Sequence, residues 1–438
     1  MPKRIVVVGG GSAGWGPKLL SDLLLTPSLS DSVYVLHDLN ATNAERIARF
    51  ARKLAGELGV GATIQTETDP DRAIEGADFV VVTISTGGLA AMANDLAIPE
   101  EYGIFQTVGD TAGPGGWSRT LRNVPVFVEL ARRIDRLAPN AVVLNYTNPM
   151  TTLTKTLART TKRPVVGLCH GLFENLEFLR QIFEVPDESH LHAVYGGVNH
   201  FFWTTSLVVD GRDGLAALRD RLERTTLPAL LAEVTPGRDG YYLADELFRF
   251  TGLLPYLGDR HTCEFFAPYI TSMANQATYH LKRTTIEERR ERLRRTEAEI
   301  ERMTAEEIPE HYRKRSRETA ADIIDAFVAG KPFVDVGNVP NVGQIANLPR
   351  GAVVETPVLV TPNGFQPIAV GPLPEPARTW VERQVQVHEL TVAAALEGDE
   401  EKAIRALALD PAVSHLTLAQ IRELGTRLRR ANADFRNG

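Results

Sequence analysis

Three short clusters of polar and thiol side chains each follow a β-branched run that predicts a strand. They comprise Asn145–Pro149, Cys169–Gly171 and Gly197–His200. Because the carboxyl ends of strands in a doubly wound sheet meet at the ligand crevice, we expect the clusters to converge. A thiolate from Cys169 and an imidazole from His200 would form a two-ligand metal site with positions left for substrate oxygens. Taken singly, either residue could be an ordinary packed side chain, so the metal hypothesis depends on their joint placement.

A glycine pattern with the spacing G-x-G-x-x-G stands between the predicted strand Arg4–Val8 and a helical pattern that begins near Trp15. Such a turn lets the backbone approach a pyrophosphate, whose charge meets the free N–H groups of the following helix. Asp38 ends the second predicted strand, where a carboxylate can accept both ribose hydroxyls and would repel a 2′-phosphate. The sequence therefore predicts an NAD site. The residues predicted to contact NAD are Gly9, Gly11, Ser12, Gly14, Asp38, Thr83 and Asn145.

The elements that must position these residues alternate between short β-branched runs and longer helical patterns up to about residue 185. This rhythm predicts a parallel sheet with crossover helices, and so an α/β fold with a Rossmann-type doubly wound sheet. The predicted parallel strands are Arg4–Val8, Ser32–His37, Ala62–Glu67, Phe79–Ile84, Ala141–Asn145 and Val165–Leu168.

A mixed α+β pattern follows after about residue 190. We therefore place an NAD-binding domain at 1–190 and a substrate, metal and oligomerisation domain at 191–438. The second domain is expected to contain an apolar stretch at Ala193–Val209, a charged helix at Thr285–Met303, a hairpin at Val353–Gly364 and helices from about Glu375 onward. Arg and Glu at helical spacing in Glu287–Lys314 are typical of a solvated or subunit-facing helix.

The composition fits an enzyme-sized globular protein that acts on small molecules. The 438 residues are 43% hydrophobic, and 55 acidic against 48 basic residues give a net charge of −7, which argues against a nucleic-acid or anionic-membrane partner. The N-terminus lacks the long apolar core of a signal peptide, so we expect a cytoplasmic protein. Two cysteines, Cys169 and Cys263, do not make a disulfide framework.

The ordered set of motifs resembles glycoside hydrolase family 4 over nearly the whole chain. Members of that family use NAD and usually manganese, so the resemblance implies NAD, Mn²⁺ or another divalent first-row metal, and a homodimer or homotetramer. A hydroxy-acid dehydrogenase shares the glycine turn but requires an Asp-x-x-Arg pair with a catalytic histidine, which we do not find. The motifs that carry the resemblance are Gly9–Gly14, Asp38, Thr147–Pro149, Cys169–Gly171, Asn199 with His200, and Val339–Gln344.

The resemblance assigns roles to individual residues. Cys169 and His200 match the metal ligands of the family, and Asn148 matches a residue that contacts the sugar hydroxyls. Asp259 stands where the family places its base, a tyrosine in the phosphosugar branches; alternatively, Asp259 and Arg260 form a structural ion pair in a loop. The predicted catalytic residues are thus Asp259, Cys169 and His200, and the predicted substrate contacts are Asp110, Arg119, Asn148, His170, Asn199, Arg260 and His261.

The mechanism implied by the resemblance is a transient oxidation rather than the usual two-carboxylate displacement. NAD takes a hydride from carbon 3 of the sugar, and the resulting ketone and the hydroxyl on carbon 2 chelate the metal. Asp259 removes the acidified proton from carbon 2, directly or through a water. The aglycone is then eliminated, water adds at carbon 1, and the hydride returns, so that the cofactor is regenerated in each cycle.

The resemblance points to an α-linked uronide, with a galacturonide favoured. Val108–Gly116 and Gly258–His261 look like the α-galacturonidase branch, although that branch has a glutamate where Gly171 stands. Arg119, Arg260 and His261 could bind the sugar carboxylate; alternatively, the two arginines pair with Asp110 and Glu264. The other hypotheses are a glucuronidase, a neutral α-glucosidase or α-galactosidase, an NAD-dependent sugar or hydroxy-acid dehydrogenase, and a non-catalytic NAD-binding protein.

Overall fold

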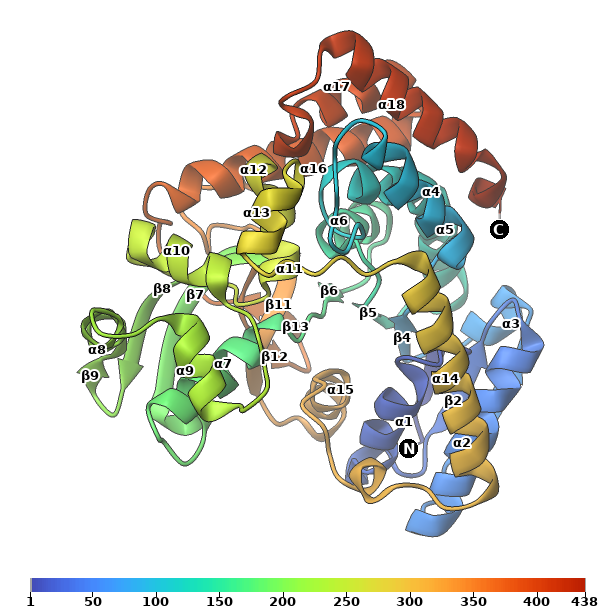
Figure 1. The fold of residues 1–438 in the computed structure, drawn as a ribbon. Coiled ribbons are helices and arrows are strands. Elements are labelled where there is room, and N and C mark those ends of the chain that lie inside the picture. Colours follow the sequence, from blue (N-terminus) through green and yellow to red (C-terminus); the bar gives the residue numbers. More distant parts are fainter. Residues whose placement is uncertain (1, 438) are drawn as a thin grey trace.

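Six parallel strands form one half of a mixed sheet in the computed structural model, which describes residues 2–437 (Figure 1). Their order, β3-β2-β1-β4-β5-β6, is that of a doubly wound nucleotide-binding sheet. This confirms the predicted fold class, and each strand lies within two residues of its predicted bounds. The strands are β1 Arg4–Val8, β2 Val33–His37, β3 Thr63–Glu67, β4 Phe79–Val82, β5 Val142–Asn145 and β6 Val165–Gly167.

Helices cover both faces of this parallel half, which explains the almost continuous apolar strands. In β1, Ile5 and Val7 join a core formed with α1 and α2, whereas Val6 and Val8 join a second core formed with α5 and α6. Alternate residues of one strand are thus buried on opposite faces. The helices of this half are α1 Gly16–Leu24, α2 Ala41–Leu58, α3 Pro70–Ile74, α4 Gly88–Glu100, α5 Gly113–Leu137 and α6 Met150–Thr160, whereas α7 Gly171–Ile182 packs against α9 and β7 of the other half.

Antiparallel strands extend the same sheet beyond β6, in the order β11-β12-β7-β8-β10. The predicted hairpin is present, with β12 at Val353–Thr361 paired to β13 at Gly364–Pro367. The chain thus forms one continuous sheet, and the boundary at residue 190 between two domains stays a prediction. The remaining strands are β7 Leu191–Val198, β8 Phe201–Val209, β9 Arg212–Asp213, β10 Leu254–Pro255 and β11 Phe333–Pro340.

Helices from residue 214 onward surround these strands, and the C-terminal ones pack against helices of the nucleotide-binding half. The C-terminal helices α16 and α18 pack against α5 and α4, and the two sets lie together in Figure 1. None of the helices in the described part of the chain is long and apolar enough to cross a bilayer. The helices of this later part are α8 Gly214–Leu222, α9 Leu227–Val234, α10 Tyr242–Thr251, α11 Asp259–Thr262, α12 Ala267–Ile270, α13 Met273–Thr278, α14 Ile286–Ala305, α15 Ala320–Ala329, α16 Ala377–Glu397, α17 Glu400–Ala408 and α18 Leu418–Ala431.

Helix α14 is the predicted charged helix, and a capping box at Thr285 begins it. It is mostly exposed, and only Ile300 and Met303 are buried. It is nevertheless fastened to α2, because Arg46 forms ion pairs of 2.9 and 3.1 Å with Glu297 and Glu301. The helix therefore lies along the nucleotide-binding half (Figure 1) instead of facing only solvent.

Candidate active site

One row of paired residues crosses the sheet beneath the predicted site. Along this row Asn145 pairs with Gly167, Gly167 with Asn338, Asn338 with Glu355, and Glu355 with Gly197. Thr147, Cys169 and Asn199 each lie two residues beyond a member of the row. The row thus links the strands that precede the three clusters, although β7 runs antiparallel to β5 and β6.

Cys169 and His200 face each other at this edge. The Cys169 Sγ lies 3.2 Å from the His200 Nε2, and His200 occupies the two-residue turn between β7 and β8 with a φ of +61°. Its Nδ1 lies 3.1 Å from the Thr111 Oγ1, which donates its hydrogen to the Asp110 Oδ1 at 2.8 Å. Because the Thr111 hydrogen is used, the Nδ1 must donate to Thr111, which leaves the Nε2 lone pair directed toward Cys169.

This pair fits a divalent cation. Donors 3.2 Å apart can both reach one ion at the usual distances of about 2.0–2.3 Å. Burial and the nearby Glu355 raise the pKa of the Cys169 thiol, and a bound cation would overcome that by taking the thiolate as its ligand. The described residues contain no cluster of three or more His, Cys, Asp and Glu that could hold a metal. That substrate oxygens fill the remaining positions stays a prediction.

Several ionisable side chains lie beside the Cys169–His200 pair, on the side of α5. Burial would raise the pKa of Asp110, but His261, Arg119 and His200 outweigh it and lower that pKa to about 2. Burial also lowers the pKa of His261 to about 4 and that of His200 well below its usual value. Both imidazoles are therefore neutral at pH 7, and Arg119 is the cation that keeps Asp110 ionised.

Three arginines near Asp110 form no ion pair with any acid in the described part of the chain. Arg119 is buried and donates to the Asn148 carbonyl at 2.8 Å and the Ser85 Oγ at 3.0 Å. Arg289 of α14 donates to the Val108 carbonyl at 2.8 Å. The alternative in which Arg119 and Arg260 pair with internal acids is therefore not what the structure contains.

Arg260 is placed differently from the prediction. Its guanidinium donates to the carbonyls of Lys282 and Thr107, at 2.8 and 3.3 Å, and to the Thr284 hydroxyl. These bonds hold the guanidinium of Arg260 against the loop that contains Lys282 and Thr284. Arg289 lies on the helix expected to be solvated or subunit-facing, and the charge of Asp110 acts on its guanidinium. We therefore regard Arg289 as a candidate to face an anion.

Asp259 also departs from its predicted setting. Its two carboxylate oxygens accept the N–H groups of Leu243 and Ala244, both at 3.0 Å, and so cap the first turn of α10. Burial raises its pKa to about 7. A carboxylate of that pKa suits a base at neutral pH, but both oxygens are already engaged. The geometry shows a helix cap, and the role of base stays a prediction.

Some of the other predicted side chains already form hydrogen bonds within the protein, and others are free to bind a ligand. Asn145 is buried, and its amide bonds to Thr147 and Thr154, so it shapes the turn after β5 and has little left to offer a cofactor. The Asn148 side chain carries no hydrogen bond within the described residues, and its oxygen and nitrogen are available to a sugar. The stretch Val339–Gln344 is structural, because Asn341 donates to three carbonyls of the following loop.

The glycine turn has the shape that close backbone approach requires. Gly9 has a φ of +90°, and a Cβ there would lie 2.3 Å from the Thr83 carbonyl oxygen. A Cβ on Gly11 would meet the Asp38 Oδ2 at 2.8 Å, and that oxygen accepts the Gly11 N–H at 3.0 Å. Ser12 closes the turn onto Gly9, whereas Gly14 has open space. The turn and the N-terminus of α1 therefore fit a dinucleotide.

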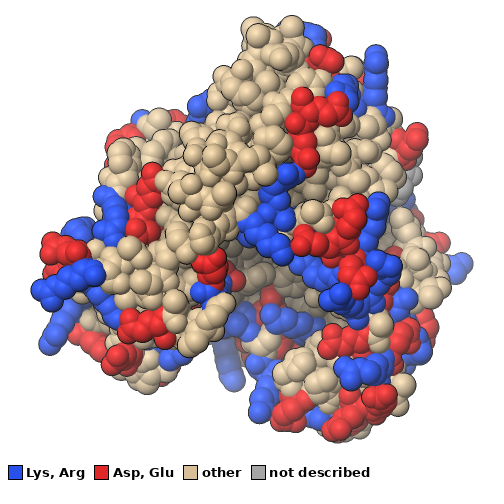
Figure 2. Space-filling view, in the orientation of Figure 1, with Lys and Arg blue, Asp and Glu red and all other residues tan. Residues whose placement is uncertain are grey.

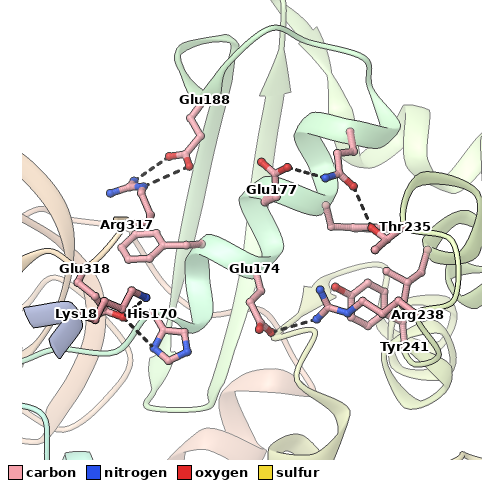
Figure 3. Close-up of a pocket in the computed structure, with 14 residues that line it drawn as sticks. Lys18, His170, Glu174, Glu177, Glu188, Thr235, Arg238, Tyr241, Arg317 and Glu318 are labelled. Atoms are coloured by element: carbon pink, nitrogen blue, oxygen red, sulfur yellow. Dashed lines mark hydrogen bonds and ion pairs between the residues drawn. The ribbon is translucent and has the colours of Figure 1, made fainter. Parts of the chain in front are cut away.

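A cleft of about 400 Å³ begins at His170, the residue after Cys169. The side chain of His170 is exposed and packs on Trp15 of the glycine turn. Figure 3 shows His170 with Glu318 on one side of the cleft and Glu174 with Arg238 on the other. Figure 2 shows the hollow at the centre of the same face, with Lys and Arg side chains at its rim. His170 thus joins the cleft to the metal pair along the chain, while Cys169 and His200 themselves do not line the cleft.

Tyr256 is a contact that the sequence analysis missed. Its ring stacks on His200 with centroids 5.5 Å apart, and a Cβ on Gly171 would meet the Tyr256 Cε2 at 2.9 Å. The ring therefore fills the space that a side chain at position 171 would need. No local pattern marks Tyr256, because the contact joins residues that are far apart in the chain.

Comparison with known proteins agrees with this arrangement. The profile of the Family 4 glycosyl hydrolases matches residues 4–185, and that of the Family 4 glycosyl hydrolase C-terminal domain matches residues 195–413. The chain is 33% identical to the alpha-galacturonidase of Bacillus subtilis (strain 168) over 426 residues, which cover 94% of this chain and 93% of that protein.

Solved structures have the same fold. The crystal structure of the putative glucosidase lplD from Bacillus subtilis superimposes with a TM-score of 0.89 at 30% identity, covering 98% of this chain and 100% of that one. A 6-phospho-alpha-glucosidase from gut microorganisms, solved in complex with NAD and Mn²⁺, superimposes with a TM-score of 0.83 at 24% identity, covering 99% of each chain.

Proposed function

The chain belongs to the family 4 glycosyl hydrolases, and from this membership we propose that it hydrolyses an α-galacturonide with the help of NAD and a divalent metal, Mn²⁺ first among them. The relatives it resembles include an alpha-galacturonidase at 33% identity. The proposal for the sugar rests on one observation in the chain itself. Arg119 and Arg289 both lie near Asp110 and form no ion pair among the described residues, so two arginines share one carboxylate and one positive charge is left for a sugar carboxylate.

NAD and the cation would bind to different sets of residues. The turn Gly9–Gly11, Asp38 and the N-terminus of α1 would hold NAD, and Cys169 with His200 would hold the cation. When bound, NAD supplies a hydride acceptor for carbon 3 of the sugar and the cation polarises the resulting ketone. The relative solved with NAD and Mn²⁺ is consistent with this pair of cofactors.

The side chains around these two sites orient the metal ligands and bind the sugar. Thr111 and Asp110 fix the ring of His200, so that its Nε2 faces Cys169. Asn148 has a free amide for the sugar hydroxyls, and Arg119 holds the backbone of Asn148 through its Nε. The proton on carbon 2 needs a base, for which Asp259 is the proposed group, provided that its carboxylate can leave the helix cap.

Arg119 is suited to a sugar carboxylate because two of its nitrogens are fixed by protein acceptors and the guanidinium is buried beside Asp110. A planar, oriented guanidinium binds carboxylates more specifically than an ammonium does. A neutral galactoside would leave the second positive charge beside Asp110 without a carboxylate. We therefore favour the uronide over the neutral sugars.

Hydrolysis of aryl glycosides tests the proposal. The enzyme is supplied with NAD, Mn²⁺ and a thiol reductant, and an aryl α-galacturonide is compared with the α-glucuronide and the α-galactoside. We expect the galacturonide to be cleaved fastest, without net accumulation of NADH. Net NADH formation in proportion to product would mean a dehydrogenase, and a preference for the galactoside would contradict the uronide.

A further inference from the structure

A buried glutamate lies directly under the metal pair. Glu355 is completely buried in β12, a strand in which valine is the commonest residue. No cation pairs with it within the described part of the chain, and its Oε1 has no hydrogen-bond partner. A buried carboxyl group with an oxygen that lacks a partner destabilises the folded chain. The presence of such a group beneath Cys169 and His200 therefore indicates a role in the site.

The other oxygen of Glu355 holds two amides. Its Oε2 accepts the Asn199 Nδ2 at 2.9 Å and the Asn338 Nδ2 at 2.8 Å. Both contacts follow from the row across the sheet, in which Glu355 pairs with Asn338 on one side and with Gly197 on the other. The three residues therefore form a fixed group in the floor of the site.

The contact with Glu355 decides how the Asn199 amide is turned. If the amide were flipped, its oxygen would face the Glu355 oxygen and two acceptors would meet. The nitrogen carries a second hydrogen, and a hydrogen bond from the Asn199 side chain acts to lower the pKa of the Cys169 thiol, against the effect of burial. The Asn199 Oδ1 has no partner, so Glu355 is the group that sets the orientation.

We propose that Glu355 is a positioning residue for the metal site: by fixing the Asn199 nitrogen toward Cys169, it makes Asn199 donate a hydrogen bond to the sulfur that binds the cation. The proposal rests on the metal site of the proposed function. It adds a carboxylate–amide–sulfur chain from β12 to the Cys169 side of the site. The Asp110–Thr111 chain does the same for His200. Outer partners of this kind change metal affinity by about 10–100-fold.

Metal binding by the holoenzyme and three variants tests this role. Free Mn²⁺ is measured by its electron paramagnetic resonance signal, and the cobalt–thiolate absorption band reports on the sulfur ligand after Co²⁺ substitution. We expect Glu355→Ala to weaken Mn²⁺ binding by about 10–100-fold and to shift the cobalt band. Glu355→Gln should bind Mn²⁺ nearly as the wild type does, because its amide oxygen can still accept the Asn199 N–H.

Asn338→Ala is the matched control. It removes the other donor to the same Glu355 oxygen and leaves the contact between Glu355 and Asn199. A purely structural role predicts that Asn338→Ala and Glu355→Ala lower the melting temperature and Mn²⁺ affinity alike. The positioning role predicts a loss of Mn²⁺ affinity only in Glu355→Ala, with NAD affinity unchanged in both.

A double-mutant cycle keeps the test decisive. Asn199→Ala should lose as much Mn²⁺ affinity as Glu355→Ala, and the double variant should lose no more than either. If Glu355→Ala does not fold, Asn199→Ala and Glu355→Gln still give the two expected results. Wild-type Mn²⁺ affinity in folded Glu355→Ala or in Asn199→Ala would overturn the positioning role. A wild-type protein that binds no divalent cation would overturn the proposed function as well.

Discussion

The cofactor side and the metal side of the site are built in different ways. On the cofactor side, the glycine turn and Asp38 lie within one β–α–β unit, and contacts such as the 3.0 Å bond from the Gly11 N–H to Asp38 are local. On the metal side, Asn199 and Glu355 meet across 156 positions of the chain. The first is specified by a short motif, and the second by the register of a sheet whose strands come from distant segments.

This difference implies that the two sides can be broken independently. A defect in the glycine turn should reduce NAD affinity and spare metal binding, and a defect at Cys169 should do the opposite. The following variants test that separation, from the largest expected effect to the smallest.

Cys169→Ser should have the largest effect on activity. It removes one of only two protein donors to the proposed cation, so hydrolysis should fall by more than about 100-fold, in line with the several kcal/mol that a catalytic metal contributes. Mn²⁺ binding should be lost and NAD affinity retained, as measured by titration of each. Activity at the wild-type level would remove Cys169 from the metal site. Chelation of the wild-type protein should give the same loss, reversed by Mn²⁺.

Gly9→Ala should weaken NAD binding. Its φ of +90° disfavours any other residue, and the new Cβ would collide with the Thr83 carbonyl. Strain of about 1–3 kcal/mol should weaken NAD binding by roughly 5–150-fold. Isothermal titration with NAD and with Mn²⁺ would measure both affinities. A parallel loss of Mn²⁺ affinity would mean that the two sides are coupled and not independent.

Arg119→Lys should discriminate between substrates. Lysine keeps the charge but not the planar fork, and loss of one charge-assisted hydrogen bond of about 1.5–3 kcal/mol should lower kcat/KM on the galacturonide by roughly 10–150-fold. The α-galactoside serves as the control and should be affected much less. Equal losses on both sugars would show that Arg119 positions Asn148 and does not bind a carboxylate.

Asp259→Asn should have the smallest effect if the helix cap is its only role. The carboxylate caps α10, and such caps contribute about 0.5–2 kcal/mol. Thermal or urea unfolding would measure this loss. Hydrolysis by the folded variant tests the second role: as the proposed base, Asp259 predicts that activity is lost at a nearly unchanged melting temperature, whereas retained activity would leave only the helix cap.

The stability difference between the wild type and Asp259→Asn should also depend on pH. Burial raises the pKa of Asp259 from 3.8 to about 7 in the folded chain. A raised pKa means that the folded state favours the protonated carboxyl group, so its contribution is fully present below about pH 4 and is lost as the pH rises through about 7. The wild type should therefore lose stability relative to the variant over that range. A constant difference would contradict the raised pKa.

The parallel half of the sheet could be predicted well because its information is local. Period, glycine spacing and short polar clusters gave the six strands and the placement of Cys169 and His200 after β6 and β7. The rule that strand ends meet at one crevice predicted that these two residues converge, and they lie 3.2 Å apart. The contact depends, however, on the antiparallel extension of the sheet, because β7 runs antiparallel to β6.

The parts that the sequence did not reveal depend on distant contacts. Glu355 and Tyr256 carry no motif, although a single acid within the valine-rich strand Val353–Val360 is a signal that could have been noticed. Asp259 and Arg260 were assigned from a cluster that has the right residue types, but α10 and the loop at Lys282 use their polar groups. Composition cannot tell which neighbour a side chain bonds.

Deuterium incorporation tests the proposed chemistry most directly. The wild-type protein with NAD and Mn²⁺ hydrolyses an aryl α-galacturonide in deuterated water, and the free sugar is examined by proton magnetic resonance. Removal of the proton from carbon 2 before the aglycone leaves predicts deuterium at carbon 2 of the product, with no net NADH. A product that carries no deuterium at carbon 2, together with no isotope effect from substrate deuterated there, would contradict an oxidation and elimination at the Cys169–His200 site.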